Sequence, residues 1–229
     1  MIKNLDLELE KLKTKILQLG SEVEKNLFRA EKALLLLDEP IAQEIIDNDE
    51  EIDNLEISVE EKCLQILAQH QPVARDLRFV VTVLKINNDL ERIGDLVVKI
   101  ADRVIILVRK NIHELKSANG VQFPEQFSHM FAETKKMVKM CLDAFVDGNT
   151  DLAYKVCIWD DEVDKAKSII REQTEEILQQ DPGQHKYIAM LLSVSRSLER
   201  IADHATHIAE NVIYMLQGHI VRHEIDDLE

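Results

Sequence analysis

The chain has 229 residues and a formal net charge of −15, a length that allows one large domain or two small ones, each with its own core. Hydrophobic residues make up 45% of the chain and aromatic residues only 4%, which indicates an aliphatic, all-α bundle. No block rich in Lys and Arg stands out, and this argues against nucleic acid as a partner. No apolar run is long enough to span a bilayer, and the first residues do not resemble a signal peptide.

The three cysteines, Cys63, Cys141 and Cys157, are odd in number and scattered along the chain. None has the CxxC spacing of a zinc or redox motif. We therefore expect buried free thiols in a reducing cytoplasm.

Apolar residues spaced three and four apart predict three helices in the first half, at about residues 4–37, 41–68 and 74–116. Pro40 separates the first two helices and Pro72 the second from the third, because proline cannot continue a helix. Ser117-Ala118-Asn119-Gly120, followed by Pro124, is the clearest linker in the chain.

The same spacing predicts three helices in the second half, at about residues 125–146, 150–180 and 185–216. Thr150 is the expected N-cap of the second of these. Asp181-Pro182-Gly183 forms the expected turn, and Gly218 is expected to end the last helix.

The second half repeats the first, because Leu90-Glu91-Arg92-Ile93 returns as Leu198-Glu199-Arg200-Ile201. The predicted fold is therefore all-α, with two tandem three-helix bundles related by an internal repeat. The expected boundaries are residues 1–117 for the first bundle, 118–124 for the linker, 125–217 for the second bundle and 218–229 for a C-terminal tail.

Four acidic residues of the first half should meet across one helical hairpin. Carboxylates four residues apart lie on one face of a helix. Residues equally far from the turn lie at the same height, because antiparallel helices rise equally per residue. Asp53 and Glu91 are each 19 positions from Pro72, and Asp49 and Asp95 are each 23 positions away. We call these four residues the first tetrad.

The second half offers an equivalent set, centred on the Asp181-Pro182 turn. This second tetrad consists of Asp160, Asp164, Glu199 and Asp203. With 43 acidic residues in the chain, about eight acid-x-x-x-acid pairs arise by chance, so one pair alone is weak evidence. Two tetrads at matching heights are much harder to attribute to chance.

Four close carboxylates repel one another and raise one another's pKa unless a cation intervenes. Oxygen-only ligands suit hard ions such as magnesium, manganese or calcium, with iron or zinc as further choices. The hypothesis is that each tetrad binds divalent or trivalent metal, as one ion or as a cluster. The competing interpretation is a solvated acidic face balanced by Arg and Lys.

Several neighbours bear on this hypothesis. Asp102 and Glu210 lie seven residues beyond Asp95 and Asp203 and are weaker candidate ligands. Lys99 and His207 occupy equivalent positions, where Lys99 would pair with Asp95 and His207 would either ligate metal or lie on the surface. For the basic residues near the motifs, surface ion pairs are favoured over an anion site. These residues are Arg75, Arg78, Arg92 and Arg200.

The motifs of several enzyme classes are missing from the sequence. A di-iron carboxylate enzyme needs a Glu-x-x-His motif on each of two helices, and no Glu precedes any of the eight histidines by three positions. No glycine-rich phosphate loop or Ser-His-Asp arrangement is found. The residue pattern alone therefore favours a helical binding or interaction protein.

Two stretches resemble the PhoU family of bacterial phosphate-regulation proteins. The first is Gln71-Pro72-Val73-Ala74-Arg75-Asp76-Leu77-Arg78 followed by Asn88-Asp89-Leu90-Glu91-Arg92-Ile93-Gly94-Asp95. The second is Leu198-Glu199-Arg200-Ile201-Ala202-Asp203-His204-Ala205, and the ending Val221-Arg222-His223 is also similar. The likeness covers nearly the whole chain, in order.

The resemblance implies a cytoplasmic protein of two three-helix bundles, often a homodimer, that represses the phosphate-starvation response. It implies two partners, the ATP-binding subunit of a phosphate ABC transporter and a sensor histidine kinase. It also implies multinuclear metal at acidic motifs that both tetrads match, although family members often have Asn where this chain has Lys99 and His207.

We therefore expect a non-enzymatic, metal-binding adaptor. The alternative is a helical protein that stores or senses metal without a signalling partner.

Overall fold

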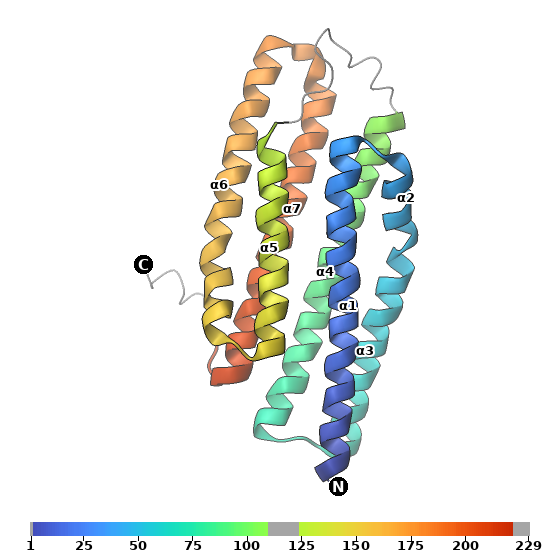
Figure 1. The fold of residues 1–229 in the computed structure, drawn as a ribbon, viewed down its shortest axis with the longest axis vertical. Coiled ribbons are helices and arrows are strands. Elements are labelled where there is room, and N and C mark those ends of the chain that lie inside the picture. The colour runs from blue at the N-terminus through green and yellow to red at the C-terminus, as the bar shows by residue number, and fades with distance from the viewer. Residues whose placement is uncertain (1, 110–123, 222–229) are drawn as a thin grey trace.

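The computed structural model describes residues 2–109 and 124–221, which are almost wholly helical and include no β-strand. Figure 1 shows α1–α4 and α5–α7 as two groups of helices that lie side by side along the long axis. Their bounds are α1 Ile2–Leu36, α2 Glu39–Asp47, α3 Asp49–His70, α4 Ala74–Arg109, α5 Gln126–Asp147, α6 Thr150–Gln180, a 3-10 turn at Pro182–Gln184, and α7 His185–Gln217. The predicted all-α fold is confirmed.

The predicted second helix was wrong in one respect, because it is interrupted at Asn48 and forms α2 and α3. Asp47, Asn48 and Asp49 follow one another, and Asn and Asp have low helix propensity because their side chains compete for backbone hydrogen bonds. The interruption is slight, since the Asn48 N–H still donates to the Glu44 carbonyl at 3.1 Å. Asp49 therefore becomes the first residue of a new helix.

The predicted N-cap of α6 was off by one residue. Asn149, not Thr150, has the extended cap conformation, and its side-chain oxygen accepts a hydrogen bond from the Leu152 N–H at 3.0 Å. Gly148, at φ +59°, ends α5 just before it. The proposed extension of the third helix to residue 116, most of the linker at 118–124 and most of the tail at 218–229 lie outside the described residues.

The two bundles pack against each other mainly along α4 and α7, which run antiparallel. Arg78 on α4 donates to the Met215 carbonyl, and Thr82 donates to the Asn211 carbonyl one turn along. Residue numbers rise on α4 as they fall on α7, which fixes the register between the halves. The repeated motifs Leu90–Ile93 and Leu198–Ile201 lie on these two central helices.

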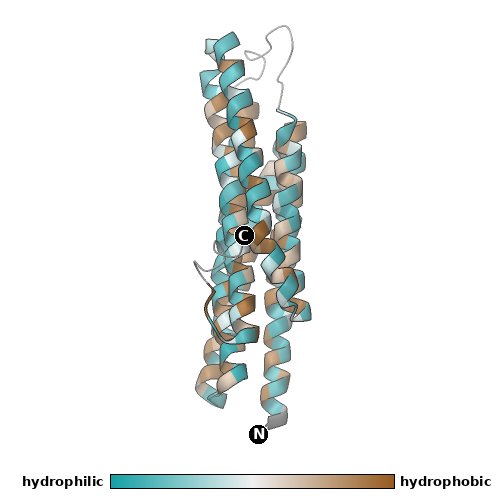
Figure 2. Cartoon of the chain, turned by 90° about the vertical axis from the view of Figure 1, so that its left-hand side faces the viewer, coloured by the Kyte–Doolittle hydropathy of each residue, from teal (hydrophilic) through white to brown (hydrophobic). Residues whose placement is uncertain are grey.

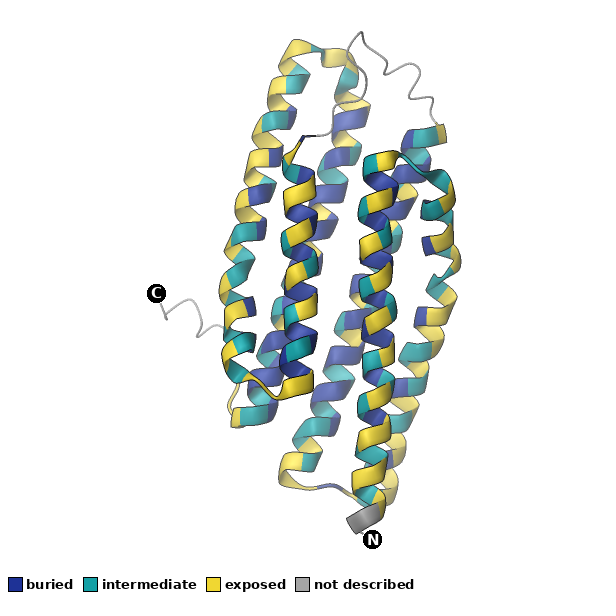
Figure 3. Cartoon of the chain, viewed as in Figure 1, coloured by how far each residue is buried: buried dark blue, intermediate teal, exposed yellow. Residues whose placement is uncertain are grey.

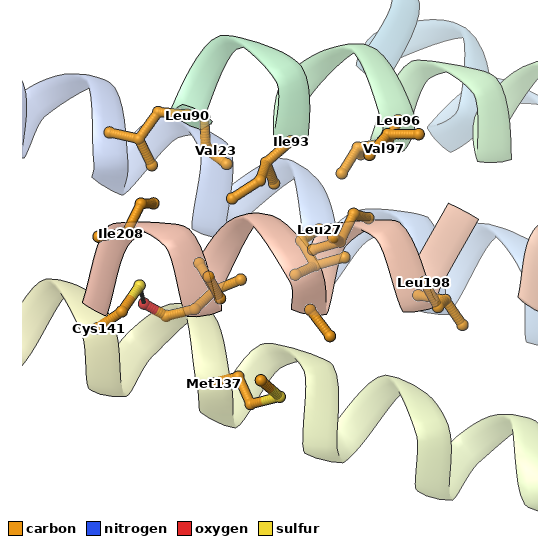
Figure 4. Close-up of a cluster of buried hydrophobic side chains, with 14 of the residues drawn as sticks. Val23, Leu27, Leu90, Ile93, Leu96, Val97, Met137, Cys141, Leu198 and Ile208 are labelled. Atoms are coloured by element: carbon orange, nitrogen blue, oxygen red, sulfur yellow. Dashed lines mark hydrogen bonds between the residues drawn. The ribbon is translucent and has the colours of Figure 1, made fainter. Parts of the chain in front are cut away.

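One apolar core runs through both halves. Leu90 on α4, Leu198 on α7 and Leu27 on α1 are fully buried in the same cluster. Figure 4 shows side chains of α1, α4, α5 and α7 converging there. In Figure 3 the buried stripe of each helix faces its neighbours, whereas the exposed stripes face outward.

Figure 2 shows hydrophilic and hydrophobic residues alternating along the helices. No described helix is both long enough and apolar enough to cross a membrane. Cys63 and Cys141 are buried free thiols, as expected, while Cys157 is only partly buried. Burial raises the pKa of Cys63 and of Cys157 to about 12, so neither thiol is poised to react as a thiolate.

Candidate metal centres

The first tetrad lies where α3 and α4 run side by side. Burial raises the pKa of Asp49, and the charges of Asp53 and Asp95 raise it further. Burial also raises the pKa of Glu91, where the Asp95 charge adds to the rise and Arg92 opposes it. These interactions cross from one helix to the other. The four carboxylates therefore share one acidic patch.

Arg92 balances part of this charge from within the motif itself. Its side chain is 60% exposed, and it lies 3.3 Å from the carboxylate oxygens of both Glu91 and Asp95. Exposed pairs of this kind contribute little stability, so they can give way to a stronger cation. Lys99 is exposed and forms no ion pair within the described part of the chain, so its expected pairing with Asp95 was wrong.

A hollow of about 480 Å³ opens beside the first tetrad. Its lining is Asp53, Glu56, Ile57, Asn88, Glu91 and Arg92. An ion or a polar group in this hollow would meet two members of the tetrad.

The second tetrad lies between α6 and α7 and is the more strongly perturbed of the two. Burial raises the pKa of Asp160 to about 7, and the charges of Asp203 and Asp164 add to the rise. Burial and the Glu199 charge raise the pKa of Asp203, against the opposing effect of His207. Ionising the carboxyl groups therefore costs more free energy in the second tetrad than in the first.

Lys167 is the basic residue that balances the second tetrad from within α6. It forms a salt bridge with Glu199 in which both side chains are about one-third exposed or less. A hollow of about 790 Å³ lies alongside. It is lined by Asp161, Asp164, Lys165, Lys167, Ser168, Ile169 and Arg171.

The donor chemistry of both tetrads fits a hard cation, because all the ligand atoms are carboxylate oxygens whose mutual repulsion a cation would relieve. Their spacing is looser than a closed single-ion site. Within residues 2–109 and 124–221, neither tetrad places three ligand atoms within 4.8 Å of one another. Bound metal would need water, side-chain rotation or more than one ion to complete its coordination.

The three weaker candidate ligands differ in exposure and in their neighbours. Asp102 is exposed on α4. Glu210 is partly buried on α7, and its charge helps to raise the pKa of Cys157. His207 is 49% exposed, and its Nδ1 lies 3.7 Å from Asp89 Oδ1. The metal assignments of all these residues stay predictions.

A polar contact between the two halves was not predicted from the sequence. His204 Nδ1 on α7 lies 2.9 Å from Asp89 Oδ1 on α4. Burial would raise the pKa of Asp89, but the hydrogen bonds to His204 and His207 outweigh it and lower the pKa. Each partner stands next to a repeated motif, since Asp89 is two residues before Glu91 and His204 directly follows Asp203. That position was the only sequence signal for the contact.

Known proteins resemble this chain over both halves. The PhoU domain family matches residues 16–104 and again residues 127–212. The phosphate-specific transport system accessory protein PhoU homolog of Pseudomonas aeruginosa is 37% identical over 216 residues, which cover 94% of this chain and 86% of that protein. PhoU homolog 1 of Thermotoga maritima is 32% identical over 211 residues, 92% of this chain and 88% of that protein.

Solved structures agree with these matches. The crystal structure of PhoU from Pseudomonas aeruginosa has a TM-score of 0.85 at 34% identity and covers 93% of this chain and 99% of that chain. The phosphate transport system regulatory protein PhoU from Streptococcus pneumoniae has a TM-score of 0.82 at 29% identity, with 95% of this chain and 99% of that chain covered.

Proposed function

Because this chain belongs to the PhoU family, we propose that it is an accessory regulator of phosphate transport that represses the phosphate-starvation response. It acts in the cytoplasm as a non-enzymatic adaptor, and as a homodimer, between the ATP-binding subunit of a phosphate ABC transporter and a sensor histidine kinase. Phosphate shortage alters these contacts and lifts the repression.

One observation carries this proposal. The match to accessory proteins of phosphate transport spans both repeats and 94% of the chain, at a length close to that of the relatives. A likeness confined to one bundle would support the fold alone. The match includes both bundles and the helices that join them, so the proposal rests on likeness over the whole two-bundle protein.

The proposal includes metal at the two tetrads. Asp49, Asp53, Glu91 and Asp95 hold metal in the first half, and Asp160, Asp164, Glu199 and Asp203 hold it in the second. A divalent or trivalent ion supplies the positive charge that the crowded carboxylates lack. The raised pKa values of Asp49 and Asp160 support this part of the proposal.

Arg92 and Lys167 compete with such an ion for the tetrad carboxylates. Each lies on a tetrad helix and pairs with a tetrad carboxylate, so metal binding displaces a side-chain cation. Both pairs are partly solvated, and the displaced cations regain water. The carboxylates therefore exchange a flexible monovalent partner for a divalent one at modest cost.

Deletion of the gene tests the regulatory role. In phosphate-rich medium, a reporter of phosphate-starvation genes is expected to switch on in the deletion strain and to return to repression when the wild-type gene is restored. A reporter that stays repressed without the gene would contradict the proposed role.

Metal analysis tests the tetrads separately. Protein purified without added metal or chelator is expected to carry iron, zinc, manganese, magnesium or calcium, measured by mass spectrometry. The Asp160→Asn/Asp203→Asn variant should lose the metal of the second half, whereas Glu176→Gln, which neutralises an exposed acid on the same helix, should not. Equal metal content in all three proteins would rule out the second tetrad as a ligand set.

The second candidate function is metal storage or sensing without a signalling partner. The paired tetrads favour it, because carboxylate clusters alone suffice for holding hard ions. Pull-down of the histidine kinase or of the transporter ATPase by the purified protein separates the two functions. Capture of neither, together with bound metal, would favour storage or sensing.

A further inference from the structure

Asp89, His204 and His207 form a compact group at the seam between the two bundles. The Asp89 Oδ1 atom lies 2.9 Å from His204 Nδ1 and 3.7 Å from His207 Nδ1. One ligand atom from each residue lies within 4.8 Å of the other two, and in the described ranges no other three His, Cys, Asp or Glu residues come so close. We infer that these three side chains form a third metal site, selective for zinc-like ions.

The donor set separates this site from the tetrads. Two imidazole nitrogens and one carboxylate oxygen suit Zn²⁺, Co²⁺ or Ni²⁺, whereas Mg²⁺ and Ca²⁺ prefer oxygen ligands alone. Three protein ligands leave a fourth position for water or for a group from a partner, as in open zinc sites. Its ligand set shares no residue with either tetrad.

The distances between the ligand atoms of Asp89, His204 and His207 fit an ion of the size of Zn²⁺. Metal–ligand bonds of about 2.0–2.2 Å in tetrahedral geometry place ligand atoms about 3.4 Å apart. The separations of 2.9 and 3.7 Å lie on either side of this value, so small side-chain movements suffice. The ion takes the place of the proton that Asp89 and His204 share, and binding releases that proton.

The surroundings provide both support and access. The side chains of Asp89 and His204 are 16% and 17% exposed, which holds them in place, whereas His207 is 49% exposed and leaves a path from solvent. The two histidines are three residues apart on α7, and their rings meet edge to face with centroids 5.7 Å apart. Rotation of the exposed His207 ring brings it onto the ion.

The position of the group gives the site a structural consequence. Asp89 belongs to α4 and the histidines to α7, so a bound ion connects the two repeats directly. An ion that binds only the folded chain raises the melting temperature, and the gain in stability grows with the logarithm of the ratio of ion concentration to dissociation constant. This link joins residues 115 positions apart in the chain.

Cobalt binding tests the proposal on the full-length, tag-free protein. Co²⁺ is titrated in excess Mg²⁺, which competes for oxygen-only sites such as the tetrads, and visible absorption reports nitrogen ligation. The wild type is expected to bind one Co²⁺ per chain, to release it to Zn²⁺, and to melt about 5 °C higher with saturating Zn²⁺. His207→Asn should weaken Co²⁺ binding at least tenfold, and Asp89→Asn should weaken it as well.

His185→Asn is the matched control, because it removes an exposed histidine from the same helix and should bind Co²⁺ like the wild type. Circular dichroism checks that each variant is folded. His207→Asn is expected to fold normally, because His207 is largely exposed. Wild-type affinity in folded His207→Asn, or no visible cobalt band in the wild type, would overturn the proposal. Loss of Co²⁺ binding in Asp160→Asn/Asp203→Asn would instead assign the ion to the second tetrad.

Discussion

The two tetrads contain the same residue types at matching heights in their hairpins, yet their electrostatics differ. In the second tetrad, burial and neighbouring charges raise the pKa of Asp160 to about 7. In the first, Asp49 and Glu91 are raised by smaller amounts. The repeated sequence therefore reproduces the position of the acids without reproducing their charge environment.

The number of neighbouring acids explains part of the difference, because burial and the charges of four acids raise the pKa of Asp160, whereas burial and the charges of two raise that of Asp49. Asp49 is the first residue of α3, directly after the slight interruption at Asn48. Asp160, at the equivalent height, lies in the interior of α6, which starts ten residues earlier at Thr150. The interruption at Asn48 has no counterpart in the second half.

The comparison also shows what the halves share. Leu90 and Leu198 occupy equivalent motif positions and are both fully buried in one core. The burial of this repeated position is therefore the same in both halves.

The largest expected effect is in this shared core. Leu90→Ala and Leu198→Ala should each lower the free energy of unfolding by about 3 kcal/mol, because each leaves a cavity in close-packed surroundings. Urea denaturation followed by circular dichroism should show a single transition in both variants. Leu64→Ala, at an exposed leucine, is the control and should have little effect. Two transitions, each sensitive to only one variant, would show that the halves unfold independently.

A smaller effect is expected from pH. Because the folded-state pKa of Asp160 lies above its ordinary value, its ionisation opposes folding, and this cost grows as pH rises from about 4 to 7. In chelator-treated protein, Asp160→Asn should gain about 1–2 kcal/mol in unfolding free energy over the wild type between pH 5 and pH 8, after allowance for solvent screening.

Asp49→Asn is the matched variant in the first tetrad, and its gain over the same pH range should be smaller. Denaturation curves at both pH values measure the two gains. An equal gain at Asp49 would remove the electrostatic contrast between the tetrads.

The smallest expected effect concerns the helix starts. Asn149→Ala should cost about 1 kcal/mol, because its side chain caps α6 through the Leu152 N–H. Asn48→Ala should cost only about 0.3 kcal/mol, because Asn48 makes no side-chain cap bond and its Nδ2 is buried without a partner. Thermal melts of both variants measure the two losses of stability. Equal losses would show that Asn149 does not cap its helix more effectively than Asn48.

The hairpin geometry was predictable because it depends on local rules. Pro72 marks the turn, and the two helices rise equally per residue. Asp53 and Glu91, which are equally far from Pro72, are therefore expected at the same height. The repeat of the Leu-Glu-Arg-Ile motif likewise identified the two-bundle architecture. Helix periodicity located α1, α5, α6 and α7 to within a few residues of their observed ends, whereas the predicted end of the third helix lies outside the described residues.

The contact between Asp89 and His204 could not be predicted in this way. The two residues are 115 positions apart, and their meeting depends on how α4 packs against α7. Helical periodicity shows that each helix has an apolar face but does not say which faces meet or in what register. The break at Asn48 was missed for a different reason, since propensity is weak beside the strong pattern of the surrounding apolar residues.

The antiparallel seam between α4 and α7 has a mechanical consequence. Each of these helices carries half of one tetrad, with Glu91 and Asp95 on α4 and Glu199 and Asp203 on α7. Side chains that interdigitate along such a seam allow small sliding movements more readily than separation. A displacement of α4 at one acidic cluster must therefore be accommodated at its packed contacts with α7, the helix that carries half of the other cluster.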